Sequence, residues 1–318
     1  KAIRRQRQMC IRDSISSDEL DRYLNEGLAM GQASNAVDYK LADGLRYRYE
    51  VENCVKEMAG QDVKGKLKTA GVDKVASIKV KEKDSGNKIA VLYAEGEIRD
   101  DDSSSPFSAD EQVISEEMAN KLRKLKDDDD VKAVVFRVNS PGGSAYISEQ
   151  IWKEVVELKA KKPIVVSMGN YAASGGYYIS CAANKIVAER TTLTGSIGVF
   201  GVVRNFTGTF DKVGVTTDIV KTNTFADLGD ISRPMREDEK ALIQRGVEQT
   251  YDLFLTRCAD GRGMTKAEID SIGQGRVWTG EQALERGLVD QLGGMDDAIK
   301  EAATLAELTD YSLSLIHI

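Results

Sequence analysis

A serine flanked by small residues is the residue best placed to do chemistry. Ser174 lies in the run YAASGGYY (171–178), which follows an apolar stretch. A serine at the start of a helix lies near the positive end of the helix dipole, and Gly175 supplies an unobstructed backbone amide. Capping the helix is the commonest role of such a serine, but capping does not explain why both flanks lack large side chains. The sequence is not G-x-S-x-G, so the α/β-hydrolase elbow is not indicated.

A second glycine-rich segment, SPGGS (140–144), also follows an apolar stretch. Glycine accepts positive φ and has no Cβ, so the amides of Gly142 and Gly143 can point into a cavity. Such amides can hold an anion or the oxyanion that develops during acyl transfer. For this motif by itself, an ordinary tight turn is the simpler interpretation.

A serine hydroxyl needs a base to attack a carbonyl group. The chain has one histidine, His317, in a C-terminal segment that we set aside below, so a Ser-His-Asp triad is not expected. The remaining plausible base is a lysine whose pKa is lowered by burial. Lys221 is the most suggestive candidate because it follows Ile219 and Val220, and Lys185 and Lys212 have less to recommend them.

Composition excludes several classes of function. A formal net charge of −7 and a pI of about 5.1 argue against nucleic acid as the main partner. No stretch approaches the roughly 18 apolar residues that a membrane span needs. The run DDDD (127–130) is interpreted as a solvated turn because four adjacent carboxylates cannot converge on one ion. Cys54, Cys181 and Cys258 form no metal pattern, and no metal or organic cofactor is indicated.

The elements that must position these residues alternate between strand and helix. Apolar runs predict strands at 89–93, 131–138 and 164–168, and amphipathic patterns predict helices at 111–126, 148–160 and 174–183. Alternation of this kind requires crossover connections, so the predicted fold class is α/β with a mostly parallel sheet and flanking helices. A Lys-rich segment at 61–87 is interpreted as a linker, with a short strand at 75–80.

Both ends of the chain look foreign. MCIRDS (9–14) and LSLIHI (313–318) can be encoded by the two strands of one sequencing adaptor, so residues 1–14 and 313–318 are set aside as adaptor-derived. An internal repeat aligns 35–45 with 282–292, with identity at Ala36/Ala283, Leu41/Leu288, Asp43/Asp290 and Leu45/Leu292. We therefore expect residues 15–60 to be the end of a truncated first repeat and residues 88–308 to be the second. A chance match between two short amphipathic helices is the alternative.

The segments SPGGSA, YAASGGYYISCAANKIVA, TLTGSIGVFG and GRVWTGEQALERGLVDQLGGMDDAI resemble signal peptide peptidase A (protease IV). This serine peptidase family has the Clp-protease/crotonase-like fold, and the resemblance covers about 88–308. It implies that Ser174 is the nucleophile and that Gly143 and Gly175 donate to the oxyanion hole. It also implies that Ser196 supports a general-base lysine in a Ser-Lys dyad.

The family has a short form and a long, duplicated form. In the short form the base lysine matches Ala226, and Lys221 does not align with it. In the long form the lysine comes from the first repeat, so the matching residue would lie upstream of Lys1 and this chain would be nearly inactive. The resemblance further implies hydrophobic signal-peptide remnants as substrates and a homo-oligomer, tetrameric in the long form. It also implies an anchor in the inner membrane, with the catalytic domain on the extracytoplasmic (periplasmic) side.

Two other classes of function remain open from the sequence. A crotonase-like acyl-CoA enzyme would also build an oxyanion hole from glycine-rich loops. A catalytically inactive assembly scaffold would use Ser174 only as a helix cap. Aromatic residues such as Tyr146, Tyr177 and Phe200 could line a substrate pocket, although aromatic side chains more often belong to the core.

Overall fold

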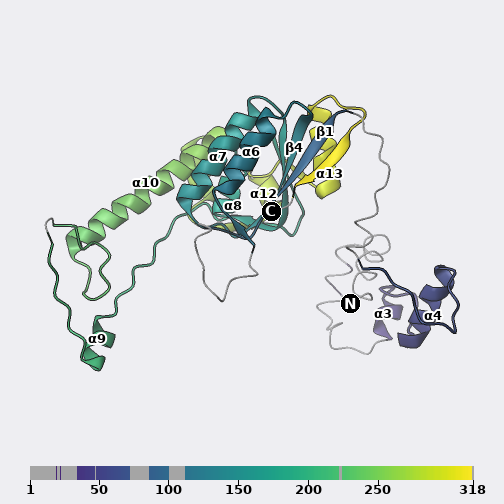
Figure 1. The fold of residues 1–318 in the computed structure, drawn as a ribbon, viewed down its shortest axis with the longest axis horizontal. Helices are drawn as coiled ribbons and strands as arrows, with labels where there is room; N and C mark the ends of the chain where they lie inside the picture. Colours follow the sequence, from purple (N-terminus) through teal and green to yellow (C-terminus); the bar gives the residue numbers. More distant parts are fainter. Residues whose placement is uncertain are drawn as a thin grey trace. The chain divides into compact units, whose positions relative to one another are not determined.

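The structure is a computed structural model that describes residues 19, 22, 34–46, 48–71, 86–99, 112–221 and 224–316. The chain divides into two compact units, Lys1–Lys81 and Glu82–Ile318. The first unit contains helix α3 (Asn35–Asp38) and helix α4 (Arg48–Met58), drawn in purple in Figure 1. Residues 1–14 and the strand predicted at 75–80 lie outside the described residues.

The second unit is built on a mostly parallel sheet, which confirms the predicted α/β fold class. The strand order is β10 (Ser312–Ile316), β1 (Lys88–Glu95), β4 (Val131–Ser140), β5 (Ile164–Ala173), β6 (Lys185–Ala188) and β9 (Gln291–Leu292). β7 (Leu193–Gly195) pairs in parallel with the end of β5, and β8 (Val277–Thr279) pairs antiparallel with β7. A separate ribbon joins β2 (Glu97–Ile98) to β3 (Val113–Ile114).

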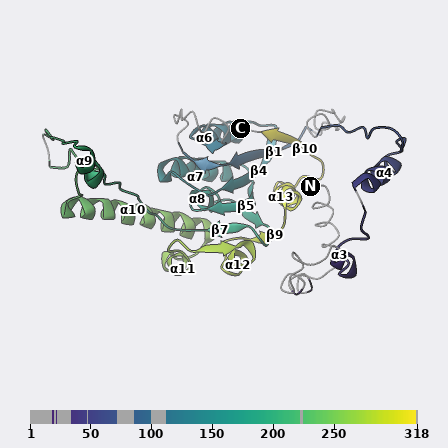
Figure 2. The ribbon, with the colours of Figure 1, turned by 90° about the horizontal axis from the view of Figure 1, so that it is seen from below.

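Alternate residues of the central strands fill two cores on opposite faces of the sheet. In β1, Ile89 and Val91 pack on one face with α13 (Met295–Leu305), whereas Leu92 packs into the larger core on the other face. The larger core is closed by α6 (Glu117–Asp127), α7 (Ala145–Lys159), α8 (Gly175–Tyr178) and the C-terminal half of α10 (Glu237–Arg262). Figure 2 shows α13 across the sheet from these helices. Burial on both faces explains why the strands are apolar throughout.

Two of the predicted helices are shorter than expected. The helix predicted at 111–126 begins only at Glu117, because Val113 and Ile114 form β3 against β2 and Ile114 is fully buried there. The helix predicted at 174–183 is the single turn α8. After α8 the chain tightens into turns, in which Ser180 and Ala183 donate backbone hydrogen bonds three residues back.

The strand β10 includes residues that the sequence analysis set aside as adaptor-derived. Residues Ser312–Ile316 pair in parallel with β1 at the edge of the sheet. Leu313 and Leu315 remain 40% and 57% exposed, so this strand contributes main-chain pairing and buries little apolar surface. Main-chain pairing requires no particular sequence, and the adaptor origin of the segment stays a prediction.

The described part of the second unit also contains three shorter helices. These are α9 (Thr207–Val213), α11 (Lys266–Ile272) and α12 (Gly280–Glu285). The first half of α10 extends beyond the sheet, and the extended segment that carries α9 connects to its N-terminal end (Figures 1 and 2). We call residues 201–240 the arm.

Candidate active site

A bulge in β5 places the residues before Ser174. β4 and β5 pair regularly up to Val138 and Met168, and then Ser140 pairs with Ala172. The Asn139 side chain fills the gap, because its Oδ1 accepts hydrogen bonds from the amides of Asn170 (3.0 Å) and Tyr171 (3.4 Å). The second half of β5 is thereby turned toward β7, so Ser174 follows directly at the carboxyl end of the sheet.

Ser174 has a backbone conformation that side-chain-bearing residues rarely adopt. Its φ is +52° and its ψ is −120°, and conformations of this kind cost on the order of 1–3 kcal/mol unless the surroundings fix them. Here the Ser174 amide donates to the Gly195 carbonyl (2.9 Å), and its own carbonyl accepts from the Tyr178 amide (2.9 Å). The Ser174 side chain makes no capping hydrogen bond to α8. The conformation therefore turns the hydroxyl away from the role of a helix cap.

The two glycine-rich segments form one wall beside Ser174. A Cβ on Gly142 would lie 2.6 Å from the Gly175 nitrogen and 2.8 Å from the Ser174 Cβ, so only glycine fits between the segments. A Cβ on Gly143 would lie 2.0 Å from the Ile98 carbonyl oxygen. Ile98 of β2 fixes this turn on both sides, since its amide donates to the Gly142 carbonyl (2.9 Å) and its carbonyl accepts from the Ser144 amide (2.7 Å).

The amides of Gly143 and Gly175 are left available by this packing. Neither donates a hydrogen bond to another residue in the described part of the chain. Both glycines line the cleft that Ser174 lines. Two unused backbone donors beside a hydroxyl are the arrangement that stabilises an oxyanion during acyl transfer.

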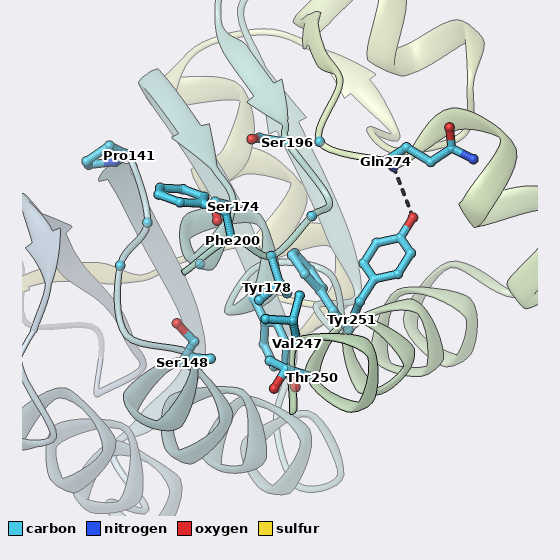
Figure 3. A pocket seen from close by; sticks show the side chains of 18 of the residues that line it. Pro141, Ser148, Ser174, Tyr178, Ser196, Phe200, Val247, Thr250, Tyr251 and Gln274 are labelled. Atoms are coloured by element: carbon cyan, nitrogen blue, oxygen red, sulfur yellow. Dashed lines mark hydrogen bonds between the residues drawn. The ribbon is translucent and has the colours of Figure 1, made fainter. Parts of the chain in front are cut away.

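Ser196 lies at the end of β7 and also has a left-handed backbone, with a φ of +48°. It lines the same cleft, so the structure brings together the four site residues that the family resemblance implied: Gly143, Ser174, Gly175 and Ser196. Figure 3 shows Ser174 between the turn that carries Pro141 and the segment that carries Ser196.

The cleft has a volume of about 1010 Å³ and is walled on one side by α10. Gln244, Val247, Thr250, Tyr251 and Phe254 of this helix line it. Its charged lining residues are Glu97 and Glu248, and the described residues that line it include no lysine, arginine or histidine. The cleft therefore holds a hydroxyl and free amides, but among the described residues it holds no amine that could serve as the base.

Lys221 belongs to a different cluster. Its Nζ donates to Asp227 Oδ1 at 2.9 Å and to the Thr224 carbonyl at 3.3 Å, within the arm. Lys185 pairs with Glu301 at 3.4 Å and is 41% exposed, and Lys212 lies in α9. None of these three lysines lines the cleft.

Tyr178, which lines the cleft, belongs to a polar network that was not predicted from the sequence. The Tyr178 hydroxyl donates to Glu149 Oε2 at 2.5 Å, and burial together with Glu149 raises the pKa of Tyr178. Arg257 of α10 donates to both Glu149 oxygens and stacks over the Trp152 ring at 3.9 Å. These contacts join residues 29 to 108 positions apart, so no local sequence pattern marks them.

The three aromatic candidates have different surroundings. Tyr177 is fully buried, and its hydroxyl donates to the Leu288 carbonyl at 2.9 Å, so it belongs to the core. Phe200 lines the cleft but is 87% exposed. Tyr146 is also exposed and is not among the lining residues.

Comparisons with known proteins identify relatives of the chain. The model of peptidase family S49 matches residues 156–309, and a Clp protease model matches residues 107–197. Protease 4 of Salmonella typhi is 41% identical over 282 residues, which cover 88% of this chain and 44% of that protein. The putative signal peptide peptidase SppA of Enterococcus faecium is 38% identical over 241 residues, which cover 76% of this chain and 70% of that protein.

The chain is thus a Clp-protease-like α/β protein with Ser174 among the residues that line its cleft. It belongs to peptidase family S49. It spans less than half the length of Protease 4 and of the chloroplastic serine protease SPPA of Arabidopsis thaliana, to which it is 33% identical over 315 residues. Within the described residues, the helices are all too short or too polar to cross a membrane.

Proposed function

We propose that Ser174 is the nucleophile of a peptide-bond hydrolysis. Its Oγ attacks the substrate carbonyl carbon while an amine accepts the hydroxyl proton, and the amides of Gly143 and Gly175 bind the resulting oxyanion. The amine then gives the proton to the departing substrate nitrogen, leaving an ester on Ser174. Water attacks this acyl-enzyme by the same route and restores the hydroxyl. The observation that carries the proposal is the strained Ser174 backbone beside two unused amides in one cleft.

We propose further that the base is a lysine supplied from outside residues 1–318 and supported by Ser196. The lack of a cationic group among the described lining residues supports this arrangement, as does the pairing of Lys221 with Asp227. The Protease 4 relative is more than twice as long as the matched segment, so a longer parent has room for a second contributing unit. A Ser-Lys dyad completed in this way is the proposed catalytic group.

The proposed substrates are hydrophobic remnants of signal peptides, as the name of the Enterococcus faecium relative suggests. Apolar lining residues such as Val199, Val247 and Phe254 suit such segments. We also propose that the full-length protein is a homo-oligomer, tetrameric in the long form. Its site would act at the outer side of the inner membrane, where an upstream anchor would hold it.

Substitution of Ser174 in the longer parent protein tests the proposal. We expect Ser174→Ala to abolish cleavage of a fluorogenic peptide, and Ser196→Ala to lower the rate by about 10–100-fold, because positioned proton transfer contributes about 10²–10⁴-fold. Ser271→Ala is the matched control, since Ser271 is exposed on α11 and donates only to the Glu268 carbonyl. Full activity in Ser174→Ala would instead support a scaffold role.

A fluorophosphonate probe distinguishes a serine peptidase from the remaining alternative, an acyl-CoA enzyme. Such a probe phosphonylates an activated serine with loss of fluoride, so mass spectrometry should find the phosphonate adduct on Ser174 of the parent. Coenzyme A binding without labelling of Ser174 would favour an acyl-CoA enzyme over a peptidase.

A further inference from the structure

The loop at 273–276 is the immediate neighbour of Ser196. The Ser196 amide donates to the Arg276 carbonyl at 2.7 Å, and the Gly275 amide donates to the Ile197 carbonyl at 2.8 Å. These two bonds continue the antiparallel pairing of β7 with β8 into the cleft wall. Whatever holds this loop therefore also holds the backbone of Ser196.

The loop itself has a strained backbone. Gln274 and Gly275 both have left-handed φ angles, +55° and +76°. For Gln274 this conformation is unfavourable unless specific contacts stabilise it. One such contact comes from a residue that lies 23 positions earlier, on α10.

That contact is made by the Tyr251 hydroxyl. It accepts a hydrogen bond from the Gln274 amide at 3.0 Å, drawn as the dashed line in Figure 3, and it donates to Asp270 Oδ1 at 2.7 Å. The loop packs closely here, because a Cβ on Gly273 would lie 2.9 Å from the Ile269 carbonyl oxygen and 3.1 Å from this hydroxyl. Tyr251 thus connects the wall helix α10, the end of α11 and the loop.

A direct role of Tyr251 in proton transfer fits the geometry poorly. Its one proton is already donated to Asp270, and an acceptor position is used by Gln274. Burial, followed by the Asp270 hydrogen bond, raises the pKa of Tyr251, so the hydroxyl stays protonated at neutral pH. Its part is to position other groups.

We infer that Tyr251, held by Asp270, is a positioning residue that fixes Ser196 in the cleft through the loop at 273–276. The connection runs from the Tyr251 hydroxyl to the Gln274 amide, along the loop to Arg276, and from the Arg276 carbonyl to the Ser196 amide. The consequence for catalysis rests on the proposed function, whereas the connection itself does not.

Amide hydrogen exchange in the 318-residue chain tests the connection without any need for activity. In Tyr251→Phe we expect the Gln274 amide to exchange at least about tenfold faster and the Ser196 amide severalfold faster, because local opening becomes easier. Amides of β6 should be unchanged. Tyr311→Phe is the matched control, since Tyr311 packs against the core that α13 covers. Unchanged exchange at Ser196, or equal acceleration in β6, would overturn the inference.

Kinetic measurements on the longer parent test whether the positioning of Ser196 by Tyr251 affects catalysis. We expect Tyr251→Phe to lower kcat about tenfold with KM within about twofold, and to add nothing when Ser196 is already Ala. Asp270→Asn keeps a side-chain oxygen to accept from Tyr251 and should retain most activity, whereas Asp270→Ala should not. Additive losses from Tyr251→Phe and Ser196→Ala would show that Tyr251 acts by another route. If the exchange result holds and the parent shows no peptidase activity, the proposed function fails and the connection stands.

Discussion

At the scale of single residues, the site depends on glycines, which have no side chain, as much as on the side chain of Ser174. Gly142 and Gly143 lie against backbone atoms at distances that no Cβ could occupy, while the hydroxyl of Ser174 is presented by a strained backbone. Ile98 bonds the Gly142 carbonyl and the Ser144 amide of this turn, and the Gly143 amide between them has no hydrogen-bond acceptor among the described residues. The wall is therefore set by close backbone contact.

This packing predicts that Gly143→Ala removes one of the two amides proposed to bind the oxyanion. The new Cβ would collide with the Ile98 carbonyl, so the turn must move and its amide leaves the cleft. Loss of one oxyanion donor costs about 10²–10³ in kcat, and we expect at least that loss in the peptidase rate of the parent. Gly246→Ala is the matched control, because a Cβ there meets no atom within 4 Å and the helix α10 should tolerate it. Equal rates for the two variants would show that Gly143 has no such role.

A second residue-scale prediction concerns the thiols. Cys181 and Cys258 are fully buried, and burial raises the pKa of Cys258, so little thiolate is available there. Cys54 in α4 is only half-buried. In the native chain at pH 8, iodoacetamide should modify Cys54 at least about tenfold faster than either buried cysteine, as peptide mapping would measure. Similar rates at all three would mean that the core opens readily.

The residue scale also separates what sequence can reveal from what it cannot. Ser174 and the two glycine-rich segments were identifiable because runs of small residues after apolar stretches allow positive φ and close backbone contact. Asn139, Tyr178 and Tyr251 were not, because their roles arise from partners 19 to 32 positions away. Asn139 in particular acts through a bulge whose register only the assembled sheet defines.

At the scale of elements, α10 has two different halves. Its C-terminal half packs into the larger core through Phe254, Leu255 and Cys258. Its N-terminal end is held instead by charge, since Glu239 is only 1% exposed and accepts hydrogen bonds from Arg233 and from the Arg236 amide. The arm therefore depends on an ion-pair cluster where the rest of the second unit depends on apolar packing.

This cluster predicts an acid-sensitive arm. The hydrogen bond from Arg233 lowers the pKa of Glu239 to about 2, below its ordinary value. The Glu239 carboxylate therefore binds a proton more readily in the unfolded arm than in the folded arm. Its contribution to the free energy of unfolding of the arm is present above about pH 4.3 and is lost as the pH falls toward 2. Amide exchange at 224–240 should accelerate over this range in the wild-type chain.

Two variants separate this effect from general acid unfolding. Glu239→Gln should give fast arm exchange already at pH 7 and a smaller further rise on acidification than in the wild type, because Asp227, whose pKa is lowered by Lys221 and Arg233, still titrates. Glu237→Gln is the matched control, because Glu237 is 89% exposed and should leave the wild-type profile intact. An unchanged profile in Glu239→Gln would rule out Glu239 as the titrating group.

The elements also show where pattern reading succeeded. Strands buried on both faces give continuous apolar runs, so the central strands were placed within a few residues. The short strand β3 was missed because two residues, Val113 and Ile114, carry no periodicity of their own. They become a strand only because β2 offers a partner.

At the scale of the whole molecule, the two segments that align in sequence, 35–45 and 282–292, share backbone geometry. Leu41 and Leu288 each donate an amide hydrogen bond to the alanine five residues earlier, at 2.8 and 2.9 Å. Lys40 and Gly287, which occupy the same repeat position, both have left-handed φ angles, +55° and +72°. Glycine adopts this conformation readily, whereas lysine does not, and yet both segments contain the same turn. This shared turn supports our proposal that residues 15–60 are the end of an earlier repeat.

A longer parent protein with a second copy of this unit would supply the lysine that the described residues of the cleft lack. The most direct measurement compares peptide hydrolysis by the purified 318-residue chain with hydrolysis by the intact parent. If a lysine beyond this chain activates Ser174, the chain should be slower by about 10²–10⁴-fold while Ser174→Ala silences the parent. Hydrolysis by the chain at the parental rate, abolished by Lys221→Ala, would contradict the account and identify Lys221 as the base.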